Sequence, residues 1–169
     1  MYLHTLKNIA GNRMKLDRID RRILEAMQQD GRISNLELAE KVGLSPTPCS
    51  RRVKRLEESG IIDQHVTLLN QSVLGLKLTA IIGISMDRHT PERFENFECQ
   101  VNEYPEIIEA SVVTGQTYDY LVKAVVPDME YYEELLLGRL TRIDGVTGVH
   151  SSFVLRKVIS KTALPLTHI

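Results

Sequence analysis

A tight turn between two short helical segments restricts the fold of this chain more than any other feature. Residues 34–42 begin with a capping-box pattern, SNLE, and place apolar side chains on one helical face. Gly43 can end this helix with a left-handed backbone, and Ser45 followed by Pro46 is a typical start for the next one. The turn itself is therefore the short stretch Val42-Gly43-Leu44-Ser45.

The segments before and after this turn complete a three-helix unit. Residues 17–29 predict an amphipathic helix, because apolar residues recur at helical spacing at Leu16, Ile19, Ile23, Leu24 and Met27. The helix after the turn is expected to run from Pro46 to Ser59, since Gly60 is a favourable residue just past a helix end. Three short helices, the last two joined by a tight turn, predict a helix-turn-helix unit.

After Gly60 the pattern changes to alternating strands and helices. Residues 61–70 predict a strand or hairpin arm, and residues 71–75 a linker. The remaining segments predict strands over 78–86, 107–114, 118–126 and 146–159, and helices over 91–102 and 129–142. The order β-α-β-β-α-β is that of a ferredoxin-like domain.

We therefore expect an α+β protein with two domains. Residues 16–77 are expected to form a winged or three-helix helix-turn-helix domain with a linker strand, and residues 78–169 a ferredoxin-like domain. Residues 1–15 precede the periodic pattern, so we expect a flexible arm or a non-native start there, with Met14 as a candidate natural start.

Charge is distributed unevenly along the chain, although the net charge is only −1. Residues 1–60 contain 12 Lys and Arg against 8 Asp and Glu, whereas residues 61–169 contain 9 against 14. The excess of basic residues suits the first part, and not the second, to binding a polyanion. The alternative is that these charges only solvate the surface. No apolar run approaches the roughly 20 residues of a membrane span. Cys49 and Cys99 form no disulfide or zinc motif, which favours a reducing cytoplasm.

The helix from Pro46 to Ser59 is expected to read DNA. Its apolar stripe of Cys49, Val53 and Leu56 can pack on the first two helices and leave a basic face outward. The second helix of such a motif enters the major groove, where Arg and Lys reach guanine or phosphate and Ser and Thr reach phosphate. We predict double-stranded DNA as a partner, contacted by Ser45, Thr47, Ser50, Arg51, Arg52, Lys54 and Arg55. A solvated basic surface helix is the alternative.

The arm after Gly60 is a second candidate for DNA contact. Gln64 and His65 on this predicted strand could touch the DNA backbone as a wing. A lone histidine is more often an ordinary surface residue, so this interpretation depends on where the strand lies.

At these residues a family resemblance becomes visible. Residues 16–77 resemble the N-terminal domain of the Lrp/AsnC (leucine-responsive, feast/famine) transcription regulators of bacteria and archaea. The matching stretches are LDRIDRRILEAMQQDGRISNLELAEKVGLSPTPCSRRVKRLEESGII and the LLN that follows. The C-terminal half resembles the effector-binding and oligomerisation domain of the same family, through TGQTYDYLVKAVVPDM and SSFVLRKVISKTALPL.

The resemblance implies a sequence-specific DNA-binding regulator of amino-acid metabolism, located at the nucleoid in the bacterial cytoplasm. Members of the family form dimers through the linker strand and the edges of the C-terminal sheets, and these homodimers assemble further, commonly into octamers. Small amino acids such as leucine, methionine or asparagine bind between dimers as effectors. No cofactor is implied.

The resemblance also implies the position of the effector site. The effector loop would be Gly115, Gln116, Thr117, Tyr118 and Asp119, and a partner subunit would add Thr147, Gly148 and Val149. Asp119 could accept from the ligand ammonium, and N–H groups of the turn could donate to its carboxylate. A plain hairpin turn is the alternative. Relative to the usual family pattern, the loop is longer by one residue, which leaves the identity of the effector open.

Two other functions remain as alternatives. The protein could be an architectural, DNA-wrapping protein of the same fold that binds no effector. An enzyme is disfavoured, because the histidines are scattered and the sequence has no HExxH, GxSxG or phosphate-binding glycine loop. We therefore expect neither catalytic residues nor a metal site.

Overall fold

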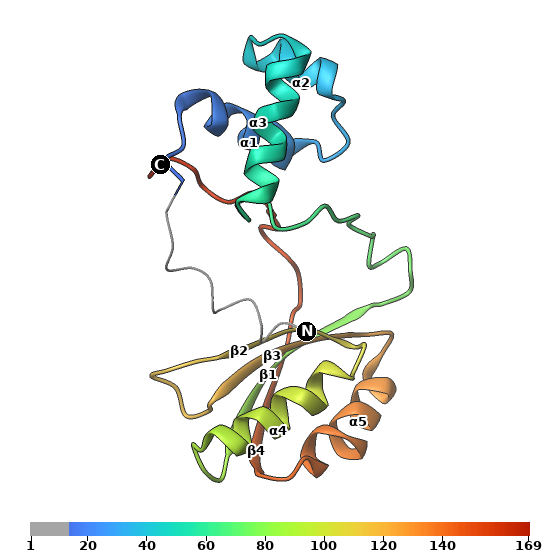
Figure 1. Cartoon of the computed structure of the whole chain (residues 1–169). Coiled ribbons are helices and arrows are strands. Elements are labelled where there is room, and N and C mark those ends of the chain that lie inside the picture. The colour runs from blue at the N-terminus through green and yellow to red at the C-terminus, as the bar shows by residue number, and fades with distance from the viewer. Residues whose placement is uncertain (1–13) are drawn as a thin grey trace. The chain divides into compact units, whose positions relative to one another are not determined.

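The computed structural model describes residues 14–169 of the chain (Figure 1). Two compact units are present, one formed by the chain up to Thr67 together with Ser160–Ile169, and the other by Leu68–Ile159. The prediction of an arm over residues 1–15 lies almost wholly outside the described residues, and Met14 packs against the helical core. The predicted domains were residues 16–77 and 78–169, whereas the two units divide between Thr67 and Leu68, and the tail Ser160–Ile169 groups with the helices.

The first unit consists of three helices, α1 (Arg18–Gln29), α2 (Asn35–Val42) and α3 (Pro46–Glu58). The predicted capping box at the start of α2 is present, with Ser34 as the N-cap residue. Asp17 forms a second capping box, with Asp20, at the start of α1. Gly43 ends α2 with a φ of 76°, a left-handed conformation that glycine adopts without steric cost. The helix-turn-helix prediction is confirmed, and it could be made because these signals act within a few residues.

A small apolar core holds the three helices together. It is built from the side chains that the helical periodicity places on the inner faces, namely Ile23, Leu24, Ala26, Leu38, Ala39, Val42, Cys49 and Leu56. Leu166, from the tail, packs against the same cluster. Cys49 is fully buried, and burial raises the pKa of its thiol, so it serves as a small apolar core residue.

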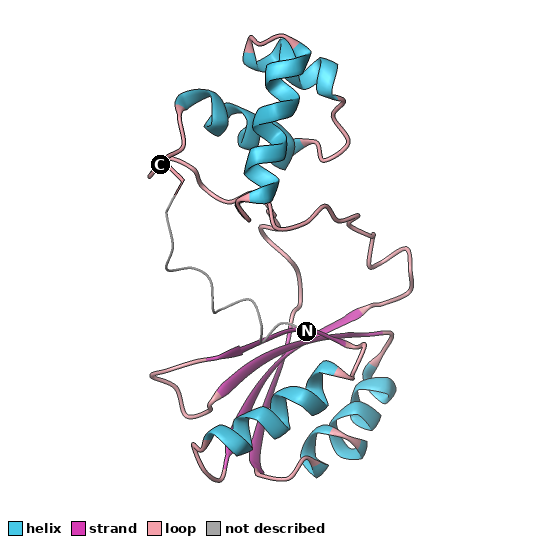
Figure 2. Ribbon diagram, viewed as in Figure 1, coloured by secondary structure: helices cyan, strands magenta, loops and turns pink. Residues whose placement is uncertain are grey.

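The second unit is a four-stranded antiparallel sheet with two helices on one face, as Figure 2 shows. Its elements are β1 (Leu78–Met86), α4 (Pro91–Asn102), β2 (Ile107–Val112), β3 (Tyr120–Val126), α5 (Met129–Gly138), a short 3₁₀ helix (Leu140–Arg142) and β4 (Val146–Phe153). The strand order is β2-β3-β1-β4, so β1 lies inside the sheet between β3 and β4. The predicted ferredoxin-like topology is confirmed.

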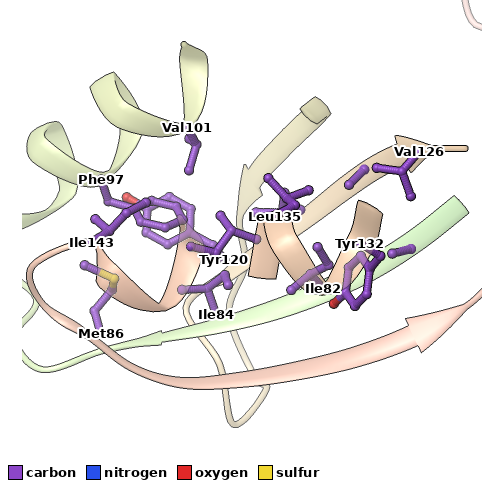
Figure 3. Close-up of a cluster of buried hydrophobic side chains, with 14 residues drawn as sticks. Ile82, Ile84, Met86, Phe97, Val101, Tyr120, Val126, Tyr132, Leu135 and Ile143 are labelled. Carbon is purple, nitrogen blue, oxygen red and sulfur yellow. The ribbon is translucent and has the colours of Figure 1, made fainter. Parts of the chain in front are cut away.

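The core of this unit lies between the sheet and its two helices (Figure 3). Successive strand residues point to opposite faces, so Ile82 and Ile84 of β1 face the helices while Ile81 and Gly83 face the other side. The Tyr120 ring packs against the Phe97 ring, with 4.5 Å between their centroids. Buried Tyr120 donates from its hydroxyl to Glu98 at 2.9 Å, which satisfies its polar end.

Several predicted strands are shorter than expected or absent. The predicted strand over 61–70 is not formed, and the last strand ends at Phe153 instead of Ile159. A strand needs a neighbour with free backbone groups, and the pairing of β4 with β1 stops at Ala80 and Phe153. The predicted helix over 129–142 is interrupted near Gly138, after which the chain forms a 3₁₀ turn. In the described part of the chain no helix is both long and apolar enough to cross a membrane.

Candidate functional site

The outer face of α3 carries polar and basic side chains that project into solvent. Cys49 and Leu56 are buried against α1 and α2, so the helix can present only its other side. Six of the seven predicted DNA contacts are exposed: Ser45, Thr47, Ser50, Arg51, Lys54 and Arg55. The Ser45 side chain makes no capping hydrogen bond, although the residue holds the N-cap position. Its hydroxyl is thus available to another group.

Two of the predicted DNA contacts, Arg52 and Arg55, form ion pairs within the helical unit. Both donate to the carboxylate of Asp20, which is only 1% exposed. Arg55 approaches both carboxylate oxygens, at 2.8 and 2.7 Å, and Arg52 lies 2.7 Å from Oδ1. The buried acid on α1 draws the Arg55 guanidinium toward the helix interface, while 49% of the Arg55 side chain stays exposed. Its contact with DNA remains a prediction.

Asp17 extends this ion-pair network at the start of α1. Its carboxylate accepts from Arg52 at 2.6 Å and from the backbone N–H groups of Ile19 and Asp20, both at 2.8 Å. The bond from the Asp20 N–H and that from Arg52 lower the Asp17 pKa to about 2. The carboxylates of Asp17 and Asp20, in turn, raise the pKa of Arg52. This cluster fixes the N-terminus of α1 against α3 and leaves only part of the α3 charge free.

The free part of the α3 charge consists of Arg51 and Lys54. Within residues 14–169, Arg51 has no ion-pair partner. Lys54 meets Glu58 one turn along the helix at 3.7 Å, with both side chains mostly exposed, a geometry that contributes little. Arg51 and Lys54 can therefore contact an approaching polyanion without breaking a buried interaction.

Hydrogen bonds also fix the turn that aims α3. The Arg22 guanidinium donates to the last carbonyls of α2, at Lys41 (2.6 Å) and Val42 (3.2 Å). Asn35 donates to the Pro46 carbonyl at 3.0 Å and so joins the start of α2 to the start of α3. The position of the exposed face is thus determined by side chains from both preceding helices.

The predicted effector loop, residues 115–119, follows β2 and precedes β3. Gly115 has a φ of 79°, which the turn requires and which glycine provides. The Tyr118 ring lies over Gly83, where an added Cβ would be 2.5 Å from Cδ1 of the ring. Because the Gly83 position faces away from α4 and α5, the loop reaches over the face of the sheet that these helices leave uncovered.

Asp119 anchors this loop to the end of β1. Its Oδ2 accepts from the Met86 N–H at 2.7 Å, and its Oδ1 lies 2.7 Å from Nε2 of His89. Its own N–H donates to the Ile84 carbonyl at 2.8 Å. Both oxygens of the predicted ammonium acceptor therefore already have a partner within the chain, although a carboxylate can accept further hydrogen bonds.

Ser85 joins the loop to the second predicted effector segment. Its hydroxyl donates to the Thr117 carbonyl at 3.1 Å, and its carbonyl accepts from the Thr147 hydroxyl at 3.2 Å. Gly148 pairs with Ser85 across the β1–β4 ladder, whereas Val149 packs on the core. The chain's own Thr147 and Gly148 thus lie beside the loop, whereas the resemblance implied those of a partner.

Sequence reasoning missed Ser85, His89 and Asp20. Ser85 and His89 belong to a strand end and a loop that carry no motif, and only the fold brings them to the effector loop. For Asp20 the sequence did offer a signal. Asp17 and Asp20 are three residues apart, as are Arg52 and Arg55, and this matched spacing of acids and bases points to their pairing.

A cavity of about 380 Å³ lies elsewhere in the second unit. Residues of the linker turn and of the chain after β4 line it, among them Gln71, Lys77, Thr79, Arg156 and Lys157. None of the predicted effector residues belongs to this lining. Among residues 14–169 no three His, Cys, Asp or Glu side chains are grouped as metal ligands would be.

Comparison with known families identifies both units. The family model described as winged helix-turn-helix DNA-binding matches residues 16–63. The model described as Lrp/AsnC ligand binding domain matches residues 79–164, half of the chain. The chain belongs to the Lrp/AsnC family. It is accordingly a transcriptional regulator with a DNA-binding helix-turn-helix and a ligand-binding domain, as its sequence predicted.

Individual members of the Lrp/AsnC family are similar over most of their length. The leucine-responsive regulatory proteins of Salmonella typhimurium and Escherichia coli are each 46% identical over 143 residues, which is 85% of this chain and 87% of theirs. A transcriptional regulator of Neisseria meningitidis, solved in complex with L-Met, has a TM-score of 0.87 and 40% identity, covering 91% of this chain and 99% of its own. An AsnC family regulator from Agrobacterium tumefaciens has a TM-score of 0.86 and 36% identity, with the same coverage.

Proposed function

We propose that this Lrp/AsnC regulator reads DNA with the exposed face of α3 and that a small amino acid changes its DNA affinity. The division of charge on α3 carries the first half of the proposal. Arg52 and Arg55 are held by Asp20, whereas Arg51 and Lys54 are exposed beside Thr47 and Ser50. A helix in the major groove needs such uncommitted donors at its outer face.

Measurements of DNA affinity test the roles of Arg51 and Lys54. An operator selected from random-sequence DNA and an unrelated duplex would be compared by fluorescence anisotropy. Arg51→Ala is expected to weaken operator binding about 10- to 100-fold and unrelated binding much less, because a base contact carries specificity. Lys54→Ala should weaken both alike and reduce the salt slope by about one, as a phosphate contact would.

A matched control and a contrary outcome complete this test. Arg142→Ala removes an exposed arginine from the second unit and should leave both affinities unchanged. Wild-type affinity of both α3 variants for both duplexes would exclude this face as the DNA-reading surface.

The amino-acid half of the proposal is supported by named relatives and by the chemistry of the loop. The related proteins of Salmonella and Escherichia coli are called leucine-responsive, and the related Neisseria structure contains L-Met. Backbone N–H groups of such a turn suit a ligand carboxylate, and the Asp119 carboxylate suits a ligand ammonium. We therefore propose leucine, methionine or a similar amino acid as the effector, held by residues 115–119 and 147–149.

We further propose that the regulator works as an oligomer of dimers, commonly an octamer, in the bacterial cytoplasm. Val66, Leu68 and Leu69, in the segment between α3 and β1, are 65–72% exposed. Val158 and Ile159, after β4, are 80% and 75% exposed. Exposed apolar side chains on unpaired chain segments are typical of surfaces that pair with another copy. The effector would then lie between subunits and act by favouring one assembly state.

An effector-independent architectural protein is the second candidate, since the same fold could wrap DNA without a ligand. Thermal unfolding of the full chain in the presence of each of the twenty amino acids separates the two. A specific effector must raise the unfolding temperature, because it binds the folded state alone. No shift with any amino acid would favour the architectural role.

A further inference from the structure

The last residues of the chain belong structurally to the DNA-binding unit. Ser160–Ile169 group with the three helices and not with the sheet unit from which they emerge. The contact is specific, because the side-chain amide of Gln28 on α1 bonds both backbone groups of Leu164. The Leu164 N–H donates to Oε1 at 2.6 Å, and Nε2 donates to the Leu164 carbonyl at 3.2 Å.

Side-chain packing reinforces this backbone recognition. Leu166 is partly buried against the core of the helical unit, whereas Leu164 is 72% exposed. The tail therefore presents the backbone of residue 164 to Gln28 and the side chain of residue 166 to the core. The Ile169 N–H donates to the Leu166 carbonyl at 3.4 Å and closes the end of the tail into a turn.

We propose that the C-terminal tail is an intramolecular ligand of α1 that ties the DNA-binding unit to the rest of the chain at a second point. The first tie is the linker at Thr67–Leu68, and the second is the crossing at Ile159–Ser160. The tail leaves the outer face of α3 free, because its contacts fall on α1 and on the core. The docked tail limits the orientations of the DNA-binding unit and does not cover the outer face of α3.

The consequence concerns DNA sites with two half-sites. A DNA-binding unit held by two ties explores fewer orientations than one held by a single linker. Once one unit of an assembly has bound its half-site, the next unit is therefore present at a higher effective concentration at the second half-site. The second tie lies a short segment, residues 154–159, after β4, which contains Thr147 and Gly148 of the proposed effector site. This part of the inference rests on the proposed function, whereas the docking of the tail does not.

Hydrogen exchange of the full-length protein tests the docking itself. In the wild type the Leu164 amide should exchange slowly, since it is bonded to Gln28. Gln28→Ala should speed its exchange about tenfold or more, whereas Gln29→Ala, one exposed residue further along α1, should not. Equal exchange at residue 164 in all three proteins would overturn the docking.

DNA affinity tests the consequence. With a selected operator in paired and single half-site form, Gln28→Ala and a chain ending at Ala163 should lose about three- to tenfold in affinity for the paired site and nothing for the single one. Faster exchange with unchanged paired-site affinity would overturn the coupling and leave the proposed DNA binding intact. If the wild type bound neither duplex, the proposed function would fail, and the exchange result alone would still decide the docking.

Discussion

The Arg55 guanidinium donates to both carboxylate oxygens of Asp20, at 2.8 and 2.7 Å, across the contact between α3 and α1. Asp20 is nearly inaccessible to solvent, and Arg52 shares its Oδ1. A buried carboxylate is tolerated only when its charge and hydrogen bonds are satisfied. The two arginines therefore stabilise the helical unit, and the proposed reading of DNA depends mainly on the neighbouring residues of α3.

Asp20→Ala is expected to destabilise the helical unit by about 2–3 kcal/mol, because it removes a carboxylate with several charge-assisted hydrogen bonds. Urea unfolding followed by far-ultraviolet circular dichroism measures the change, which suits a chain without tryptophan. Glu58→Ala is the matched control. It breaks only the exposed pair with Lys54 and should change stability by less than about 0.5 kcal/mol.

The arginine partners of Asp20 provide a second check on the same cluster. Arg55→Ala should lower stability while leaving the ratio of operator to unrelated-DNA affinity unchanged, since its guanidinium serves the helix interface. A variant of normal stability with lowered operator specificity would place Arg55 on the DNA instead.

Acid titration should reveal Asp17. Its folded-state pKa of about 2 lies below the ordinary value of 3.8, so its ionised form contributes stability above about pH 4, and this is lost as the pH falls toward 2. The carboxylate is 51% exposed, so solvent screening limits the gain to about 1 kcal/mol or less. Asp17→Asn keeps an N-cap acceptor and should flatten the fall in urea midpoint between pH 4 and pH 2. An undiminished fall in the variant would assign the acid sensitivity to other groups.

The sequence predicted the helical unit well because its signals are local. Capping boxes, the left-handed Gly43 and the apolar stripe each act within a few residues. The strands were less predictable at their ends, since an apolar segment forms a strand only where a neighbour offers free backbone groups. Residues 154–159 have suitable side chains, but the ladder with β1 ends at Phe153.

The candidate sites depend on contacts between distant residues, which periodicity does not reveal. A helical projection separates the buried face of α3 from its exposed face, but Arg55 lies between the two. The direction of its guanidinium is determined by the buried Asp20, which no projection of α3 contains. Family resemblance predicted residues 115–119 as the effector loop, whereas the contacts of Ser85 and His89 with this loop follow from the fold alone.

Gly83→Ala should disturb the proposed effector loop, residues 115–119. The added methyl group would meet the Tyr118 ring at 2.5 Å, so the ring must move, and we expect a loss of about 1–3 kcal/mol in stability together with weaker amino-acid binding. Tyr118→Ala in the same chain removes the clash and should restore most of the stability. If the double variant were no more stable than Gly83→Ala alone, the contact between this ring and β1 would not be the cause.

Asp119 and His89 should affect amino-acid binding in opposite directions. Asp119→Asn removes the negative charge proposed to accept the ligand ammonium and is expected to weaken binding about tenfold or more. His89 lies 2.7 Å from Oδ1 of the same carboxylate, so we expect it to compete with the ammonium at that oxygen even though the carboxylate has further acceptor positions. His89→Ala should therefore strengthen binding severalfold, as isothermal titration calorimetry would show with the amino acid that gives the largest thermal shift. Weaker binding in His89→Ala would mean that the imidazole contacts the ligand or orients Asp119 for it, and the competition between the two would be excluded.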